Sequence, residues 1–344
     1  MSALAAELWD DVVTRVRREL GRAVVRAVAL PGGANNRLYE LVAADGGRLL
    51  LKAYFPDERD RLGREFGTLA FLCGRGFAEL PRALVRGDKQ RYGVYSFEEG
   101  AVRRGAELSV AEAVAIARFW AELHRLGPDD VEVDLPRAIS GCFSVRDNLE
   151  VIRTRLRDFL ASPSLRSYPE LIAFVAETPV AAEIESLIAT ALSGLPRREI
   201  DAVLPRSAWR LTNGDSGPHN VLLRPDSRIC VLDWEYAGWE DPVRMAVEFV
   251  SHIGAVGMRP EVRRAFLGTY AAAAGLTDRD LRRLRQTELL YAINWAAVHL
   301  TGMTETKLAS RRFALADFDL SGYLRAGIAS YRARVAEARA LMAG

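Results

Sequence analysis

One short segment constrains the fold of this 344-residue chain more than any other. It reads Asn213-Gly214-Asp215-Ser216-Gly217-Pro218-His219-Asn220 and continues into two apolar runs on either side of Pro225-Asp226-Ser227, then Asp233. Two short apolar runs joined by such a turn predict a β-hairpin. A hairpin of this length returns Asp233 to the loop that began it. Asp215, Asn220 and Asp233 are therefore expected to converge.

This convergence indicates a metal and proton-transfer site. Two carboxylates and an amide oxygen suit a hard cation such as Mg²⁺, which keeps some of its waters for substrate phosphates. A carboxylate that is not on the metal could orient a substrate hydroxyl and accept its proton. Capping of a turn is the ordinary role of Asp and Asn, but it does not account for the hairpin and the second carboxylate together.

The rest of the chain divides into a β-rich part and a helical part. A helix over 3–20 precedes strands expected at 24–30, 38–43, 49–55, 83–85 and 92–95, with one helix inserted over 57–73. From Ser109, where Ser109 and Glu112 form a capping box, the pattern is helical apart from 209–236. We expect an α+β chain with two lobes: an N-terminal antiparallel lobe over 1–100, a hinge near 95–105, and a mostly helical lobe over 106–344 with a helical insertion over about 140–205.

Lysine is rare in this chain, since only Lys52, Lys89 and Lys307 are lysines among 47 basic residues. Lys52 lies on the third expected strand. Glu65 lies at the edge of an apolar stripe on the following helix, where a carboxylate is costly to bury without a partner. Lys52 is the expected partner. A lysine on a strand that is held by a glutamate on a helix is how a kinase grips the α- and β-phosphates of its nucleotide.

The segment from Asp215 to Asp233, continued through Trp234-Glu235-Tyr236-Ala237-Gly238-Trp239 and Asp241-Pro242, resembles the aminoglycoside phosphotransferase and choline kinase-like family of small-molecule kinases. The resemblance covers roughly residues 24–300. It implies a protein kinase-like fold with a catalytic loop at 213–220 and a metal loop at 233–236. It also implies that Asp215 is the catalytic base, that Asn220 and Asp233 bind magnesium, and that Lys52 and Glu65 serve the nucleotide.

The resemblance also implies a nucleotide site. Gly32, Gly33, Asn35 and Asn36 would form the phosphate-covering loop, and backbone groups near Ser96 and Glu98 would bind the adenine edge. His124 is interpreted as a structural histidine that braces the catalytic loop, and His219 is not expected to carry the phosphate. Two departures from the family pattern are Asn213, where a histidine is usual, and Val243-Arg244-Met245, where an aspartate often occurs.

The resemblance predicts that ATP, or GTP, supplies a phosphate to a hydroxyl of a small molecule with Mg²⁺. An aminoglycoside-like antibiotic, an amino sugar or a related natural product is the expected acceptor, and a choline-like, homoserine-like or methylthioribose-like alcohol is the alternative. Asp215 and Glu235 are expected to contact the acceptor, and Asp317 and Asp319 are further acidic candidates. Two other interpretations stay open: a non-catalytic nucleotide-binding protein, and a metal-dependent phosphohydrolase, which leaves Lys52 and Glu65 unexplained.

The charge balance disfavours other classes of function. With 47 basic and 45 acidic residues the net charge is +2, so neither a nucleic-acid binder nor a membrane-surface binder is expected. Cys73, Cys142 and Cys230 show no paired spacing, which is typical of a reducing compartment. We see no signal peptide and no apolar run long enough to span a bilayer. A cytoplasmic monomer or homodimer is the resulting expectation.

Overall fold

A computed structural model describes residues 6–31, 35–131, 135–226, 228–315 and 317–343 of the chain. Internal contacts divide the chain into two compact units. The first, here called the β unit, contains Met1–Val102, Asn220–Ala237 and Ala309–Phe318. The second, here called the helical unit, contains Arg103–His219, Gly238–Leu308 and Asp319–Gly344. The β unit thus includes two segments from the second half of the chain.

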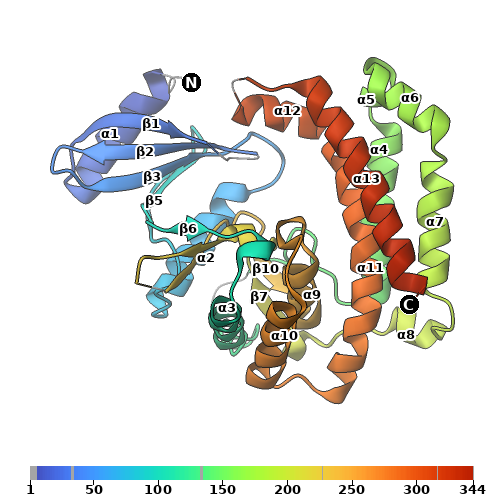
Figure 1. Cartoon of the computed structure of the whole chain (residues 1–344). Coiled ribbons are helices and arrows are strands. Elements are labelled where there is room, and N and C mark those ends of the chain that lie inside the picture. The colour runs from blue at the N-terminus through green and yellow to red at the C-terminus, as the bar shows by residue number, and fades with distance from the viewer. Residues whose placement is uncertain (1–5, 32–34, 132–134, 227, 316, 344) are drawn as a thin grey trace. The chain divides into compact units, whose positions relative to one another are not determined.

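An antiparallel sheet with strand order β1-β2-β3-β5-β4 forms the centre of the β unit (Figure 1). Alternate residues of each strand face opposite sides of a sheet, and in β2 one such set, which includes Leu41, is buried. Val12 and Val16 of the preceding helix pack in the same core, with no exposed surface. The elements are α1 (Ala6–Leu20), β1 (Val24–Leu30), β2 (Arg37–Ala43), β3 (Arg48–Ala53), β4 (Ala83–Gly87) and β5 (Tyr92–Ser96).

The single helix inserted between β3 and β4 is α2 (Arg61–Gly74). It begins four residues later than expected because Asp60 is its N-cap and accepts a hydrogen bond from the N–H of Gly63. Its buried face carries Leu62 and Leu69 of the predicted apolar stripe, and it also carries Leu72 and Glu65. The helix therefore brings a carboxylate into the interior of the β unit.

A second, three-stranded sheet in the β unit contains the predicted hairpin. Its strands are β6 (Ala101–Val102), β8 (Val221–Leu223) and β9 (Ile229–Val231), in the order β6-β8-β9. Val221 pairs with Val231, and the N–H of Leu232 donates to the carbonyl oxygen of Asn220 at 2.8 Å. The hairpin is therefore confirmed, and it places Asp233 one residue from a direct backbone contact with Asn220.

The helical unit is built around α11, which contacts α4, α7, α9 and α13, while α3 packs on α10 (Figure 1). Helix α4 ends just before Ser162-Pro163 and α6 just before Thr178-Pro179, because a proline cannot continue a helix without loss of a hydrogen bond. The helices are α3 (Val110–Leu123), α4 (Val145–Ala161), α5 (Ser164–Ser167), α6 (Pro169–Glu177), α7 (Val180–Ala191), α8 (Arg197–Asp201), α9 (Pro242–Ser251), α10 (Pro260–Ala274), α11 (Asp278–Gly302), α12 (Glu305–Ala314), which continues into the β unit, and α13 (Leu320–Ala343).

Short elements complete this unit. Two strands, β7 (Arg210–Thr212) and β10 (Gly238–Glu240), pair antiparallel. The 3-10 turns are η1 (Gly105–Glu107), η2 (Arg206–Ala208), η3 (Pro218–Asn220), which ends at the first residue of the β unit's second segment, and η4 (Ile253–Ala255). The capping box of Ser109 and Glu112 begins α3 as predicted. Strand β7 leads directly into the loop that contains Asp215.

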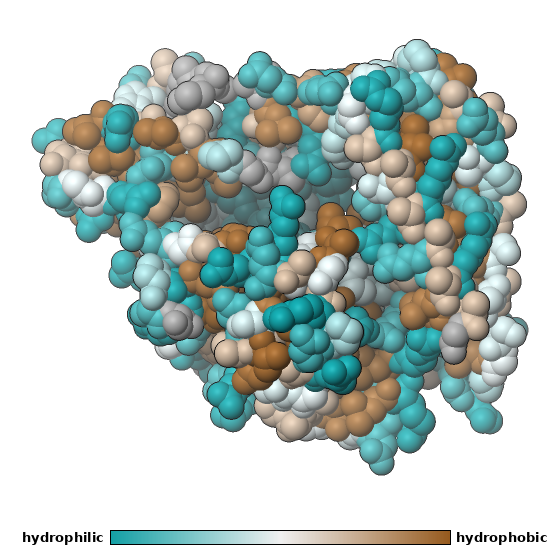
Figure 2. Space-filling model, viewed as in Figure 1, coloured by the Kyte–Doolittle hydropathy of each residue, from teal (hydrophilic) through white to brown (hydrophobic). Residues whose placement is uncertain are grey.

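Among the described residues, no helix is both long enough and apolar enough to cross a membrane. On the face shown in Figure 2, hydrophilic residues are interspersed with hydrophobic ones along α13. The buried residues of this helix include Leu324, Tyr331 and Val335, which recur at near-helical spacing on one side.

Candidate functional site

Lys52 and Glu65 form a buried ion pair in the β unit. Strand β3 holds Lys52 between Leu38 of β2 and Gly93 of β5. The Nζ of Lys52 donates to Glu65 Oε2 at 2.7 Å, and the two side chains are 8% and 6% exposed. The hydroxyl of Tyr54 donates to the same oxygen at 2.7 Å. A buried carboxylate is costly without such partners, so the pairing that the sequence predicted is present and explains the burial of Glu65.

Two further carboxylates surround the same ammonium group. Asp233 Oδ1 lies 2.6 Å from Lys52 Nζ, and Glu235 Oε2 lies 3.4 Å from it. Burial acts to lower the pKa of Lys52, but Asp233, Glu65 and Glu235 outweigh it and hold that pKa well above its usual value. Burial raises the pKa of Asp233 to about 7, helped by Glu235 and Glu65 and opposed by Lys52. Lys52 is therefore a charged group within a negatively charged cluster.

The backbone and charge of this cluster both suit a cation. The backbone of Asp233 has φ +58, a left-handed conformation that residues other than glycine rarely adopt. Such conformations tend to occur at functional positions. One oxygen each of Glu65, Asp233 and Glu235 lie within 4.8 Å of one another. These three carboxylates face two cations, Lys52 and Arg61. The surplus of hard oxygen donors could hold a divalent ion.

Glu235 serves this cluster and not an open surface. Arg61 Nη1 lies 2.5 Å from Glu235 Oε1, and Asn36 Nδ2 donates to Glu235 Oε2. Tyr236 receives hydrogen bonds from Asn35 at 3.0 Å and from Arg61 at 2.9 Å. The side chain of Glu235 is only 1% exposed. A contact between Glu235 and the acceptor, which the sequence led us to expect, does not fit this burial, because both carboxylate oxygens are already occupied.

Of the other residues predicted to bind the nucleotide, the structure describes Ser96 and Glu98 but not the two glycines. Gly32 and Gly33 lie outside the described residues. The N–H of Ser96 donates to the carbonyl oxygen of Arg82 at 2.9 Å, so this group belongs to the sheet. The hydroxyl of Ser96 donates to Glu98 at 2.6 Å, and Arg224 of the hairpin turn pairs with the same carboxylate at 2.6 Å. The segment after β5 is thereby tied to the β8–β9 hairpin.

In the helical unit, Asn213 fastens the loop that it begins. Its side chain has no exposed surface. The Nδ2 of Asn213 donates to the carbonyl oxygen of Asp215 at 3.1 Å, while Oδ1 accepts from the N–H of Asp215 at 3.3 Å and from the hydroxyl of Ser216 at 3.0 Å. The loop-fastening role expected for an asparagine in place of the usual histidine is thus met by these contacts.

His124 braces the strand that leads into the loop. Its Nε2 lies 3.1 Å from the carbonyl oxygen of Leu211 in β7, and its Nδ1 lies 2.6 Å from the hydroxyl of Tyr270. Because a carbonyl oxygen can only accept, the ring proton is on Nε2, and Tyr270 donates to Nδ1. Burial, with help from the charge of Arg210, lowers the pKa of His124 to about 3. A neutral imidazole with hydrogen bonds at both ring nitrogens matches the interpretation of His124 as a structural histidine.

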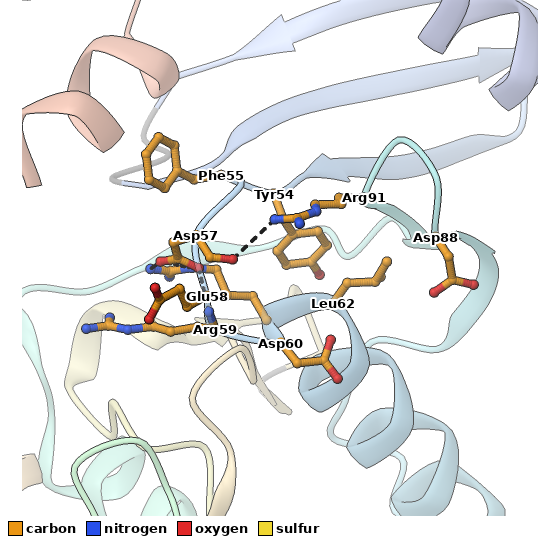
Figure 3. A pocket seen from close by; sticks show the side chains of 10 residues that line it. Tyr54, Phe55, Asp57, Glu58, Arg59, Asp60, Leu62, Asp88 and Arg91 are labelled. Atoms are coloured by element: carbon orange, nitrogen blue, oxygen red, sulfur yellow. Dashed lines mark hydrogen bonds and ion pairs between the residues drawn. The ribbon is translucent and has the colours of Figure 1, made fainter. Parts of the chain in front are cut away.

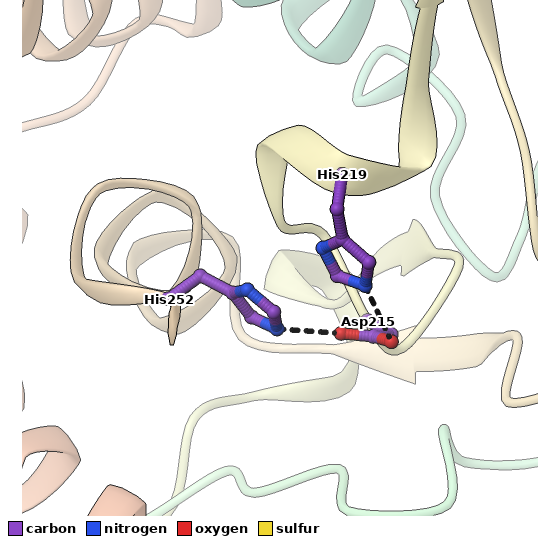
Figure 4. A group of neighbouring side chains, drawn as sticks. All are labelled: Asp215, His219 and His252. Atoms are coloured by element: carbon purple, nitrogen blue, oxygen red, sulfur yellow. Dashed lines mark ion pairs between the residues drawn. The ribbon is translucent and has the colours of Figure 1, made fainter. Parts of the chain in front are cut away.

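Asp215 lies between two histidines in the helical unit (Figure 4). His252 Nε2 is 2.9 Å from Asp215 Oδ1, and His219 Nε2 is 3.5 Å from Oδ2. Burial acts to raise the pKa of Asp215, but hydrogen bonds from His219 and His252 outweigh it and hold that pKa far below its usual value. A carboxylate that stays ionised is available to accept a proton or a hydrogen bond.

Sequence reasoning missed His252. It lies 37 residues after Asp215 and belongs to no recognised motif. The only signal was that histidine is scarce, with four in the chain: His124, His219, His252 and His299. Of the acidic candidates near the C-terminus, Asp319 accepts a hydrogen bond from the N–H of Gly322 at 2.9 Å, as a cap at the start of α13.

A small cavity of about 250 Å³ lies in the β unit at the start of α2 (Figure 3). Arg61 pairs with Asp57 at 2.6 Å, and Arg91 donates to the carbonyl oxygen of Asp57 at 3.2 Å. Four acidic residues and three arginines line the cavity, so it has no surplus positive charge for an anion. Its lining residues are Tyr54, Phe55, Asp57, Glu58, Arg59, Asp60, Arg61, Leu62, Asp88 and Arg91.

A larger cleft of about 660 Å³ lies in the helical unit and includes His252 in its wall. Apolar side chains form much of it, and Ile253 and Val256 are 44% and 62% exposed. Burial, together with the charge of Arg334, lowers the pKa of His299 in the cleft wall to about 4, so this ring is neutral at neutral pH. The lining residues are Val250, Ser251, His252, Ile253, Ala255, Val256, Gly257, Met258, Arg263, His299, Ser330, Ala333, Arg334 and Glu337.

Solved structures share this architecture. Spectinomycin phosphotransferase APH(9)-Ia, solved with ADP and spectinomycin, is 16% identical with a TM-score of 0.60, and the match covers 93% of this chain and 98% of that one. Choline kinase from Cryptosporidium parvum Iowa II is 12% identical with a TM-score of 0.60 and 96% of each chain covered. A macrolide 2'-phosphotransferase type I is 17% identical with a TM-score of 0.57, over 92% of this chain and 100% of that one. The fold is therefore protein kinase-like, as predicted.

Comparison at the level of sequence identifies the family. No curated protein sequence matches this chain. The family model described as the phosphotransferase enzyme family, APH, matches residues 26–286, which is well over half of the chain and contains Lys52, Glu65, Asp215, Asn220 and Asp233. The chain therefore belongs to the APH phosphotransferase family and is a small-molecule phosphotransferase of the kinase-like fold.

Proposed function

We propose that this protein transfers the γ-phosphate of ATP to a hydroxyl group of a small molecule and requires Mg²⁺. The observation that carries the proposal is the cluster of buried Lys52 and Glu65 with the partly exposed Asp233, joined by contacts of 2.7 and 2.6 Å. A kinase needs a lysine held by a glutamate to grip the nucleotide phosphates, and an aspartate nearby for the metal. GTP could replace ATP, because no described contact distinguishes the two bases.

Each residue has a defined part in this proposal. Lys52 binds α- and β-phosphate oxygens, and Glu65 holds its ammonium group in place. Asn220 and Asp233 hold Mg²⁺, which when bound would neutralise charge on the phosphate oxygens. Asp215, kept ionised by its two histidines, orients the acceptor hydroxyl and takes its proton.

We assign Glu235 a different part from the one expected from the sequence. Its contacts with Arg61 and Asn36 tie the metal loop to the turn before β2 and to the start of α2. This arrangement supports a role in holding Asp233 and Lys52 in register. Asn35 and Asn36 would likewise hold the metal loop in place, since their side chains donate to Tyr236 and Glu235 respectively.

The cleft that includes His252 supports an acceptor of low positive charge. We propose this cleft as the acceptor site because His252 contacts Asp215 at 2.9 Å. Both arginines of the cleft wall form ion pairs, Arg263 with Glu288 and Arg334 with Glu337. Among the described lining residues Glu337 is the one carboxylate, and Arg334 already neutralises it. A polycation would find little electrostatic attraction there.

The acceptor is accordingly an alcohol with apolar surface, and we consider three classes of acceptor. The first is an aminoglycoside-like antibiotic or an amino sugar, the second a related natural product with fewer charges, and the third a choline-like, homoserine-like or methylthioribose-like metabolite. The cleft favours the second class. Solved relatives of the same fold are named for spectinomycin, macrolides and choline.

We further propose a cytoplasmic location and a monomer or homodimer. The three cysteines, Cys73, Cys142 and Cys230, are unpaired in the structure. Burial raises the pKa of Cys142 and of Cys230 to about 12, so neither thiol is a ready nucleophile. Unpaired buried thiols suit a reducing compartment.

A coupled ADP-release assay tests the proposal. The protein is incubated with ATP or GTP, with Mg²⁺ or with a chelator, and with spectinomycin, gentamicin, streptomycin, a macrolide, amino sugars, nucleoside antibiotics and choline. We expect acceptor-dependent ADP release that requires Mg²⁺. Nucleotide binding without turnover across the whole panel would instead support a non-catalytic protein. Phosphate release from a phosphoester without nucleotide would support a phosphohydrolase.

A further inference from the structure

We propose that His252 is a positioning residue for Asp215. With its proton on Nε2, it donates to Oδ1 of Asp215 and thereby fixes the orientation of the carboxylate that receives the proton of the acceptor hydroxyl. This inference rests on the proposed role of Asp215 as the base. It adds a residue that lies outside the catalytic loop and outside every motif in the sequence.

The hydrogen bonds of His252 determine which ring nitrogen carries the proton. The N–H of Gly254 donates to His252 Nδ1 at 2.9 Å, so that the imidazole caps η4. A nitrogen that accepts a hydrogen bond carries no proton. The proton of the neutral ring is therefore on Nε2, which lies 2.9 Å from Asp215 Oδ1. His252 donates, and the carboxylate accepts.

Packing holds this ring in place. Only 3% of the His252 side chain is exposed. One face stacks on His219, with ring centroids 4.4 Å apart and planes at 15°. The His252 ring and the buried Trp295 ring pack in a T-shaped arrangement, with centroids 4.5 Å apart and planes at 88°. The orientation of the donor is therefore set by the core of the helical unit and not by solvent.

The loop that contains Asp215 packs closely against the His252 ring. A Cβ atom added to Gly217 would lie 2.4 Å from His252 Nδ1 and 2.6 Å from His219 Nδ1. Real Cβ atoms do not approach other atoms so closely, so residue 217 must be glycine for the loop to lie against the imidazole. The backbone of the catalytic loop and His252 thus form one packed arrangement.

The same geometry argues against a metal ion among Asp215, His219 and His252, whose ligand atoms lie within 4.8 Å of one another. A metal on Nε2 of His252 would require the ring proton to be on Nδ1. That proton would face the N–H of Gly254, and two donors would oppose each other. The contact with Gly254 therefore favours a hydrogen bond to Asp215.

This arrangement suits the transfer step. The hydroxyl oxygen of the acceptor forms a bond to the γ-phosphorus as the bond from that phosphorus to the bridging oxygen of ADP breaks. The hydroxyl proton passes to Asp215 Oδ2, whose nearest histidine nitrogen, on the 42% exposed His219, is 3.5 Å away. Oδ1 remains bound to His252 throughout. A carboxylate whose Oδ1 is held by a fixed donor keeps one orientation toward the acceptor.

A spectroscopic test requires no acceptor. With four histidines in the chain, nitrogen-15 NMR signals of the imidazole rings can be assigned by single substitutions. We expect the ring proton of His252 to be on Nε2, with Nδ1 accepting from Gly254, and the Nε2 proton signal to move in the Asp215→Asn variant. A proton on Nδ1, protonation of both nitrogens, or no response to Asp215→Asn would overturn the proposal.

A kinetic test uses ATP with water as the acceptor. The variant His252→Leu keeps the bulk and loses the donor, so kcat is expected to fall about 10- to 100-fold with little change in the KM for ATP. His252→Gln, which keeps a donor at the same reach, should recover most of that loss. The Lys89→Gln variant, in the exposed turn between β4 and β5, is the control for handling.

The outcomes separate the two proposals. If Asp215→Ala retains full activity, the assignment of the base is wrong. If Asp215→Ala is inactive while His252→Leu matches wild type, the base stands and the positioning role is wrong. Equal losses in His252→Leu and His252→Gln would also overturn the role of the donor. Where hydrolysis by water is too slow to measure in wild type, the NMR signature decides.

Discussion

Removal of the Lys52 ammonium should destabilise the folded protein strongly. The Lys52→Met variant keeps the aliphatic stem and leaves Glu65, Asp233 and Glu235 facing a single cation, Arg61. Glu65 and Glu235 are 6% and 1% exposed, so water cannot replace the lost partner. Breaking a buried pair in this way costs about 3–5 kcal/mol. We expect the free energy of unfolding to fall by that amount.

Urea unfolding at pH 8, without nucleotide or metal, measures this loss. The matched control is Lys89→Met, which removes an ammonium from an exposed turn and should change the unfolding free energy by no more than about 0.5 kcal/mol. In a double-mutant cycle with Glu65→Gln, the two losses should fall short of additivity by about 0.5–3 kcal/mol, because the residues are in contact. Equal effects of Lys52→Met and Lys89→Met would refute the account of a buried ionic cluster.

Three further predictions concern the helical unit. Asp215→Ala should lower kcat at least about 100-fold while ATP affinity stays within a few-fold, as measured by ADP release and calorimetry, and full activity would contradict its role as base. The pKa of His124 near 3 lies below its unfolded value of about 6.5, so only the unfolded state takes up a proton as pH falls through that window. From pH 7 to 5 the wild type should therefore lose about 2 kcal/mol more unfolding free energy than His124→Gln, and parallel losses in urea titrations would disprove this. Gly217→Ala should cost about 1–3 kcal/mol and reduce kcat because its Cβ would overlap His252, whereas Gly268→Ala, in an open place on α10, should be neutral or stabilising in thermal unfolding.

Local patterns carried the sequence-based predictions that succeeded. The β8–β9 hairpin follows from two apolar runs around a turn, and the contact between Lys52 and Glu65 follows from a carboxylate on an apolar stripe that needs a partner. Both depend on residues that are near in sequence or on a single buried charge. The start of α2 was placed too early because Asp57 and Asp60 are both acceptable N-cap residues in the sequence, and only Asp60 caps the helix.

Contacts between distant segments explain what sequence could not supply. Glu235 was expected to face an acceptor, but Arg61 and Asn36, more than 170 residues earlier, cover it. His252 reaches Asp215 only because α9 and η4 carry it there, and no spacing rule connects the two residues. The inclusion of Ala309–Phe318 in the β unit likewise depends on tertiary contacts, such as that of Arg37 with the carbonyl oxygen of Phe313 at 2.7 Å.

The most direct test of the account follows the γ-phosphate itself. The protein is incubated with ATP that carries a radiolabelled γ-phosphate, with each acceptor of the panel, and the products are separated. We predict that label appears in a phosphorylated alcohol in the presence of Mg²⁺, and that Lys52→Met and Asp215→Ala prevent its transfer. Label that remains in ATP, or is released only as inorganic phosphate with every acceptor, would contradict a phosphotransferase acting on these alcohols.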